Sequence, residues 1–79
     1  MVVDLAAIRR AAGVTQEQLA ERLGCRQGQI SRTEHQSDFL LSTLVAYLRA
    51  LGADAELAIT VPGRKTIHQI LTDHIEDQH

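Results

Sequence analysis

Apolar residues recur at intervals of three and four along four segments of the first 52 residues, with polar side chains between them. This spacing gathers the apolar side chains on one face of a helix, and it predicts helices over about 3–12, 15–23, 26–33 and from just after Ser42, a good N-cap, to just before Gly52. The residues predicted to face inward are Leu5, Ile8, Ala12, Leu19, Ala20, Leu23, Ile30, Leu44, Val45, Leu48 and Leu51.

The stretch from residue 15 to residue 32 has the layout of two short helices joined by a turn. Thr15 and Gln18 form a capping-box pattern, in which two backbone N–H groups at a helix start are satisfied reciprocally. Gly24 follows the first helix, because glycine enters the left-handed conformation without a Cβ penalty. On the second helix, the side chains on the face away from the inward Ile30 are Gln27, Gly28, Ser31 and Arg32. Such a polar face, braced from behind, is typical of a DNA recognition helix.

Residues 55–61 alternate with a period of two, which predicts a strand that ends at Pro62-Gly63. No other segment of the sequence is predicted to be a strand, and a lone strand cannot satisfy its own backbone hydrogen bonds. We therefore expect it to pair with the same strand of a second copy across a two-fold axis. The predicted dimerisation residues are Leu57, Ile59 and Val61. The alternative is an extended arm lying against the helices of its own chain.

A fifth helix is predicted over residues 66–75. Thr66 and Gln69 repeat the capping-box pattern, and Ile67, Ile70, Leu71 and Ile75 form an amphipathic stripe. Its charges oppose the helix dipole, since basic residues precede its start and acidic residues crowd its end. This helix therefore needs a packing partner, which is its own domain, the sister subunit or another protein. The predicted fold is mainly α, with five helices and one strand, divided into residues 1–52 and 53–79.

Composition and charge narrow the function. The 79 residues suit one domain with an aliphatic core, and the single cysteine, Cys25, excludes an internal disulfide and is interpreted as a small buried hydrophobe. No apolar run is long enough for a membrane span and no signal segment is evident, so a cytoplasmic location is expected. Residues 1–33 carry five basic and three acidic side chains, a net charge of +2, against −4 for residues 34–79. This modest positive excess favours DNA contact by a dimer rather than a monomer.

Catalytic and metal-binding patterns are not legible in the sequence. The histidines and Cys25 do not follow a metal-ligand spacing. Neither a nucleophile–histidine arrangement nor a glycine-rich phosphate loop is recognisable. We therefore expect no enzymatic activity, no metal and no cofactor.

The sequence TQEQLAERLGCRQGQISRTE resembles the helix-turn-helix of the phage-repressor family, also called the XRE (Cro-type) family. The agreement includes the Thr-Gln opening, the Leu-Gly turn, the Ile-Ser pair and the closing Glu34, and it extends over residues 4–52. The continuation LSTLVAYLRALGADAELAITVPG resembles one branch of that family, the HigA-like antitoxins of type II toxin–antitoxin operons. In that branch a strand follows the last helix of the DNA-binding domain.

The resemblance implies roles for individual residues. Gln16 matches a position that contacts a phosphate and steadies the next glutamine, Gln27, which matches the leading base-reading position and suits adenine. Arg32 matches a further base-facing position and suits guanine. The other DNA-contact candidates are Arg26, Gly28, Gln29 and Ser31. Arg26 is expected at a phosphate, and Gly28 allows a close approach to DNA. Each of these side chains could instead be merely solvated.

A pair of charged residues has a structural counterpart in the same family. Arg9 and Glu34 match a buried salt bridge that links the first helix to the end of the third. We assign this pair to the stability of the fold rather than to function.

The sequence thus predicts a homodimeric repressor that reads a palindromic operator with recognition helices about 34 Å apart. In one interpretation it is an antitoxin, which regulates its own operon and neutralises a cognate RNA-cleaving toxin of the HigB/RelE kind. In the other it is a stand-alone regulator without a toxin partner. A third interpretation is a protein-interaction module that has lost its DNA contacts.

Overall fold

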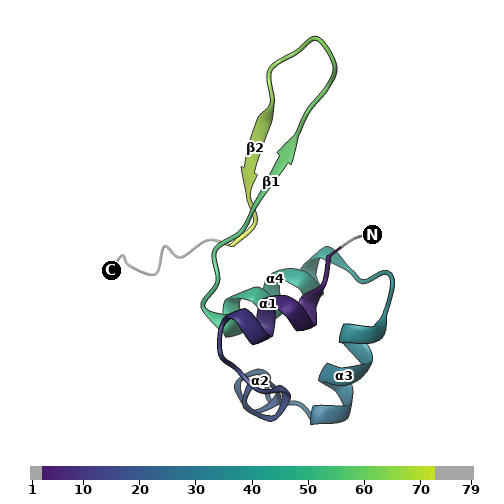
Figure 1. Cartoon of the computed structure of the whole chain (residues 1–79), viewed down its shortest axis with the longest axis vertical. Helices are drawn as coiled ribbons and strands as arrows, with labels where there is room; N and C mark the ends of the chain where they lie inside the picture. The colour runs from purple at the N-terminus through teal and green to yellow at the C-terminus, as the bar shows by residue number, and fades with distance from the viewer. Residues whose placement is uncertain (1–2, 73–79) are drawn as a thin grey trace.

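The computed structural model describes residues 3–72, which form a helical domain followed by a hairpin that projects from it (Figure 1). The four helices come first along the chain, and the hairpin strands are antiparallel. The elements are α1 (Leu5–Ala11), α2 (Gln16–Leu23), α3 (Gln27–His35), α4 (Leu41–Leu51), β1 (Glu56–Ile59) and β2 (Ile67–Ile70).

The ends of α2 follow the local signals in the sequence. The Thr15 hydroxyl accepts from the backbone N–H of Gln18 at 3.1 Å, and the Gln18 side chain accepts from the backbone N–H of Thr15 at 2.9 Å. The predicted capping box is therefore confirmed. Gly24 ends the helix in the left-handed conformation with φ of 70°, where a side chain would be strained.

The start of α4 differs from the prediction. Leu40, not Ser42, is the N-cap, and it offers no side-chain hydrogen bond. Its carbonyl oxygen already accepts from the backbone N–H groups of Thr43 and Leu44. Ser42 thus lies inside the first turn, where its preference as a cap has no effect.

The core of the helical domain lies between the four helices and is aliphatic apart from one tyrosine. Ala12 is exposed because it is the C-cap of α1, and Leu23, at the last position of α2, is 36% exposed, so both were wrongly predicted to face inward. Cys25 is half-buried and packs against this core. The buried core residues are Leu5, Val14, Leu19, Ala20, Ile30, Leu44, Tyr47, Leu48 and Leu51.

The predicted fifth helix is wrong over the residues that the structure describes, since Ile67–Ile70 is a strand; Ile75 lies outside the described range. Pro62 and Gly63 form the centre of a tight turn in which the Arg64 N–H donates to the Val61 carbonyl at 3.0 Å, with φ of 78° at Gly63. Pro followed by a glycine of positive φ is typical of a type II turn. The turn sends the chain back along β1, so β-branched isoleucines form a strand.

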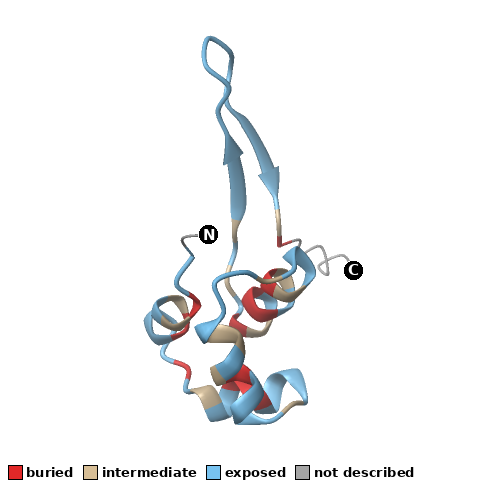
Figure 2. Ribbon diagram, turned by 90° about the vertical axis from the view of Figure 1, so that its right-hand side faces the viewer, coloured by how far each residue is buried: buried red, intermediate tan, exposed pale blue. Residues whose placement is uncertain are grey.

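The premise that the strand lacks a partner in its own chain is also wrong. β1 pairs with β2 in the register Glu56–Ile70, Leu57–Gln69, Ala58–His68 and Ile59–Ile67. At its base the hairpin is fixed to the helical domain: Ala55 and Leu71 pack against the core, and the hydroxyl of Thr72 accepts from the Ala55 N–H at 2.8 Å. Beyond that base the strands are exposed along their length (Figure 2).

Candidate nucleic-acid interface

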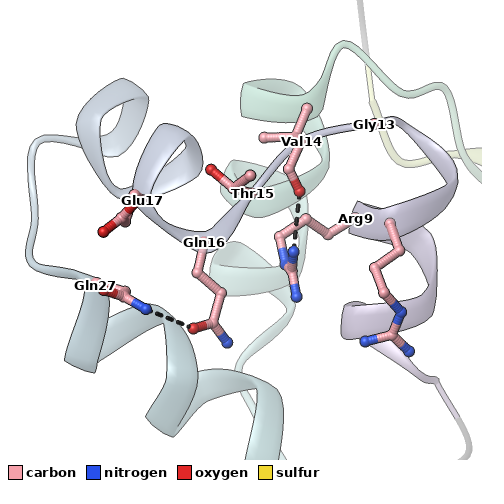
Figure 3. A pocket seen from close by; sticks show the side chains of 8 residues that line it. Arg9, Gly13, Val14, Thr15, Gln16, Glu17 and Gln27 are labelled. Carbon is pink, nitrogen blue, oxygen red and sulfur yellow. Dashed lines mark hydrogen bonds between the residues drawn. The ribbon is translucent and has the colours of Figure 1, made fainter.

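The first residues of α2 and α3 meet at the surface. Gln16 opens α2 and Gln27 opens α3. The Nε2 group of Gln27 donates to Oε1 of Gln16 at 3.1 Å, as the dashed line in Figure 3 marks. The contact expected from the resemblance, in which Gln16 steadies Gln27, is therefore present.

The outer face of α3 is polar and largely exposed. Gln27, Gly28, Gln29 and Arg32 are exposed, whereas Ser31 is half-buried. Ile30 is 3% exposed and holds the helix against the core. Arg26 is the N-cap residue of α3, but its side chain makes no capping hydrogen bond, so its exposed guanidinium is not engaged at the start of the helix. The structure thus groups the predicted DNA-contact residues around α3 and the start of α2.

Glu34 collects hydrogen bonds from three side chains behind this face. Its Oε2 accepts from Nε of Arg9 at 2.7 Å and from the hydroxyl of Tyr47, and its Oε1 accepts from Nε2 of Gln16 at 2.9 Å. The side chain of Glu34 is 3% exposed and that of Arg9 is 10% exposed. The buried Arg9–Glu34 salt bridge that the resemblance implies is therefore confirmed.

The donors around Glu34 also bond to the backbone, which ties the helices together. Arg9 Nη1 donates to the Val14 carbonyl at 2.9 Å (Figure 3), and the Leu5 carbonyl lies 3.2 Å from the Tyr47 hydroxyl, whose one proton is shared between that carbonyl and Glu34. One buried cluster thereby links α1, α3 and α4 and the turn before α2. Buried polar groups satisfied in this way favour a single arrangement of the helices.

The same contacts set the pKa values of the cluster. Burial acts to raise the pKa of Glu34, but the hydrogen bonds from Arg9, Tyr47 and Gln16 outweigh it, so this pKa is lowered. The hydrogen bond to Glu34 raises the pKa of Arg9, and burial followed by the bond to Glu34 raises that of Tyr47. At neutral pH the cluster therefore contains a carboxylate, a guanidinium and a neutral phenol.

A pocket of about 440 Å³ opens beside the two glutamines (Figure 3). It lies where α1 ends and α2 begins, and both Arg9 and Arg10 line it. The exposed guanidinium of Arg10 and the start of α2 are features that suit a phosphate group, whereas Arg9 is paired with Glu34 and Glu17 adds a carboxylate. The residues that complete its lining are Gly13, Val14, Thr15, Gln16, Glu17 and Gln27.

Two residues that take part in this region were missed in the sequence. Tyr47 falls at helical spacing with the leucines of α4, and a tyrosine buried there needs a polar partner, which was the available signal. Arg10 follows Arg9 without any pattern that separates their roles. Only the packing of α1 buries Arg9 and leaves Arg10 exposed at the pocket.

Two of the predicted dimerisation residues, Leu57 and Ile59, lie on one face of the hairpin. Because residues that pair across strands share a face, Ile67 and Gln69 lie on it too, and Val61 follows two residues beyond the end of β1. The four apolar residues Leu57, Ile59, Val61 and Ile67 are 43–51% exposed. We call them the apolar hairpin face. The opposite face carries Glu56, Ala58, His68 and Ile70, with Glu56 Oε1 2.6 Å from Nδ1 of His68.

Residues 3–72 contain neither a metal-binding cluster nor a membrane-spanning helix. In that range no three histidine, cysteine or acidic side chains come close enough together to hold a metal ion. Nor is any of the described helices long and apolar enough to cross a membrane.

This chain matches a known family and resembles individual known proteins. The helix-turn-helix domain family matches residues 1–58. The chain is 39% identical over 75 residues to Antitoxin HigA1 of Mycobacterium tuberculosis, in strains CDC 1551 / Oshkosh and ATCC 25618 / H37Rv. The match includes 94% of this chain and 48% of each relative, so the chain spans about half the length of these curated relatives.

Two solved structures share the fold. One is described as "Induced DNA bending by unique dimerization of HigA antitoxin", with a TM-score of 0.74, 32% identity, and coverage of 86% of this chain and 92% of that one. The other is described as "DNA bound antitoxin HigA3", with a TM-score of 0.72, 32% identity, and coverage of 86% and 90%. The similarity to HigA antitoxins that the sequence indicated is therefore confirmed in sequence and in fold.

Proposed function

Because the chain belongs to the helix-turn-helix domain family, we propose that it is a sequence-specific DNA-binding protein that inserts α3 into the major groove. The observation that carries this proposal is the bonded pair of Gln16 and Gln27 at the head of the exposed face of α3. Base-reading side chains need such support, because a held amide loses less freedom on binding.

Each surface residue has a proposed part in the complex. Gln27 bonds adenine through its amide, and Arg32 bonds guanine through its guanidinium. Gln16 and Arg26 contact phosphates, and Arg10 adds a cation at the pocket that Gln16 and Gln27 also line. Gly28 lets the helix backbone approach the bases, and Gln29 and Ser31 supply flanking contacts.

We further propose that the protein is a homodimer on a palindromic operator. The apolar hairpin face of Leu57, Ile59, Val61 and Ile67 lies exposed in a single chain and is the surface for the second copy. Residues 1–52 then bind DNA and residues from 53 onward hold the dimer. Support comes from the related structure described by its "unique dimerization", and from the modest positive charge of residues 1–33, which leaves a monomer with weak attraction to DNA.

The relatives favour an antitoxin over a stand-alone regulator. We propose that the protein represses its own operon and neutralises a HigB/RelE-like toxin, since the curated relatives that it matches at 39% identity are antitoxins. The proposed regulation of transcription uses α3, so toxin binding uses another surface.

DNA reading is tested by fluorescence anisotropy on the protein's own promoter. Gln27→Ala and Arg32→Ala should each weaken operator binding by about 1–3 kcal/mol and relax base preference. Thermal stability should hardly change, because both side chains are exposed. Arg49→Ala, which removes an exposed cation from α4, is the charge-matched control and should retain the base preference. Unchanged operator binding by Gln27→Ala would remove that residue from the readout.

Toxin neutralisation is tested by co-expression with the product of the adjacent gene. Wild type and Arg32→Ala should both rescue growth, because the two activities use different surfaces. Loss of rescue by a folded Arg32→Ala protein would place the toxin on α3. A harmless neighbour would favour the stand-alone regulator, and a wild-type protein that fails to bind its promoter would favour the interaction module.

A further inference from the structure

A chain of hydrogen bonds runs from the buried core to the outer face of α3. Arg9 Nε and the Tyr47 hydroxyl both donate to Oε2 of Glu34, and Arg9 Nη2 makes a longer hydrogen bond of 3.4 Å to Oε1. The other oxygen of Glu34 accepts from Nε2 of Gln16 at 2.9 Å, and Oε1 of Gln16 accepts from Nε2 of Gln27 at 3.1 Å. The side chain of Glu34 is 3% exposed, whereas Gln27 is exposed. This series of hydrogen bonds therefore connects the buried carboxylate of Glu34 to the amide of Gln27, the proposed base-reading group.

The buried carboxylate of Glu34 fixes which group donates and which accepts in each of these hydrogen bonds. An ionised carboxylate accepts hydrogen bonds and cannot donate them. Gln16 must therefore turn its NH₂ group toward Glu34, which leaves its carbonyl oxygen for Gln27. Gln27 must in turn donate to that oxygen. The amides of Gln16 and Gln27 therefore each have one orientation that makes all of these hydrogen bonds, and Glu34 selects it.

The selected orientation decides what Gln27 presents to DNA. One of its N–H groups bonds to Gln16, so its carbonyl oxygen and its second N–H point to other partners. In the major groove adenine offers one donor, N6–H, and one acceptor, N7, whereas guanine offers two acceptors, N7 and O6. An amide with an oxygen and one N–H therefore complements adenine. The reverse orientation, with two N–H groups outward, complements guanine.

We propose that Glu34 is a positioning residue for base recognition, which orients the amide of Gln27 through Gln16 and thereby selects adenine over guanine. This inference rests on the proposed DNA-binding function, because it concerns how the proposed reading residue is held. It gives the Arg9–Glu34 pair a second role beside the stability assigned to it from the sequence.

Glu34→Gln tests the proposal, because it changes an acceptor into a group with both a donor and an acceptor. With its oxygen kept toward Arg9 and Tyr47, the introduced amide presents NH₂ to Gln16. Gln16 and Gln27 then both reverse, and Gln27 turns two N–H groups outward. The ratio of adenine to guanine affinity at the base pair read by Gln27 should fall by about tenfold or more.

The measurement starts from an operator selected by wild-type protein from random DNA. Gln27→Ala identifies the base pair whose preference depends on Gln27, and fluorescence anisotropy on four operators that differ there gives the affinity ratios. Tyr47→Phe is the matched control, because it removes a donor to the same carboxylate and leaves that carboxylate an acceptor. Its adenine preference should persist. Circular dichroism checks that each variant is folded at the assay temperature.

A second variant tests the proposal even if Glu34→Gln does not fold. Gln16→Leu removes the link at a half-buried surface position, so both orientations of the Gln27 amide become accessible. Its adenine-to-guanine ratio should approach one. In the Gln16→Leu background, Glu34→Gln should cause no further change in that ratio.

Several outcomes overturn the inference. A wild-type adenine preference in either Glu34→Gln or Gln16→Leu would do so and leave the proposed DNA binding intact. Equal weakening on all four operators would also do so, because a merely structural role predicts it. If wild type binds no operator in a sequence-specific way, the proposed function fails and the inference fails with it.

Discussion

The helical domain and the hairpin differ in how much of their apolar surface a single copy of the protein buries. In the helical domain the apolar side chains form one core, and the polar side chains of Arg9, Glu34 and Tyr47 bond to one another inside it. In the hairpin the backbone hydrogen bonds are made between β1 and β2, while the apolar hairpin face stays exposed (Figure 2).

This difference separates two parts of the proposed function. The buried cluster holds α3 and its glutamines in place in each chain, so DNA reading needs no partner for its geometry. A two-stranded hairpin is at best marginally stable alone in water, and this one is anchored only at its base, through Ala55, Leu71 and Thr72. Its exposed apolar side chains are the feature that a second copy would cover.

The largest effect is expected where the buried cluster is broken. Glu34→Ala leaves the guanidinium of Arg9 buried without its carboxylate, and the free energy of unfolding should fall by about 3–5 kcal/mol. Urea denaturation followed by circular dichroism measures the change. A loss under 1 kcal/mol would show that water enters the site or that the helices rearrange around Arg9.

The apolar hairpin face gives the next largest effect, on assembly rather than on folding. Ile67→Asp places a charge among Leu57, Ile59 and Val61, so the proposed dimer should dissociate and operator affinity should fall by roughly tenfold or more. Sedimentation at micromolar concentration should give near twice the 8.7 kDa chain mass for wild type and near one for this variant.

Ile70→Asp is the matched control for that experiment. It introduces the same charge on the same strand, but Ile70 lies on the opposite face, paired with Glu56. This variant should sediment like wild type. If it dissociates too, or if wild type is itself monomeric, the dimer does not use the apolar hairpin face.

Acid should weaken the helical domain through Glu34. Its pKa is lowered in the folded state, so its stabilising contribution is fully present above the ordinary pKa of a glutamate and is lost as pH falls through the lower pKa of the folded state. The difference in unfolding free energy between wild type and Glu34→Gln should therefore shrink from pH 7 toward pH 3. Urea titrations at a series of pH values measure it, and a difference independent of pH would contradict the assignment.

The smallest effect is expected at the exposed contact between Glu56 and His68 of the hairpin. Glu56 and His68 lie 2.6 Å apart, but their side chains are 60% and 62% exposed. Glu56→Ala should change the free energy of unfolding by about 0–1 kcal/mol, since solvent screens such pairs. A loss comparable to that of Glu34→Ala would mean that the hairpin contributes far more to stability than its burial indicates.

The sequence alone determined the features that rest on neighbours along the chain. The capping box of Thr15 and Gln18 and the left-handed Gly24 depend on contacts within a few residues, and the inward position of Ile30 follows from helical periodicity; the structure confirms all three. The resemblance added the Arg9–Glu34 pair, which no local pattern contains. The positions around α3 proposed to contact DNA were likewise legible, because helical periodicity fixes which side chains share a face.

Only the tertiary structure decided the features that join distant segments. Ile67, Ile70 and Leu71 have the spacing of a helix, and pairing with β1 overrides it, because hydrogen bonds to a neighbouring strand outweigh weak local propensity. The bond between Gln16 and Glu34 spans 18 residues and exists only because α2 packs beside α3. Local sequence sets the conformations that each segment can adopt, and packing between segments selects the one that the chain keeps.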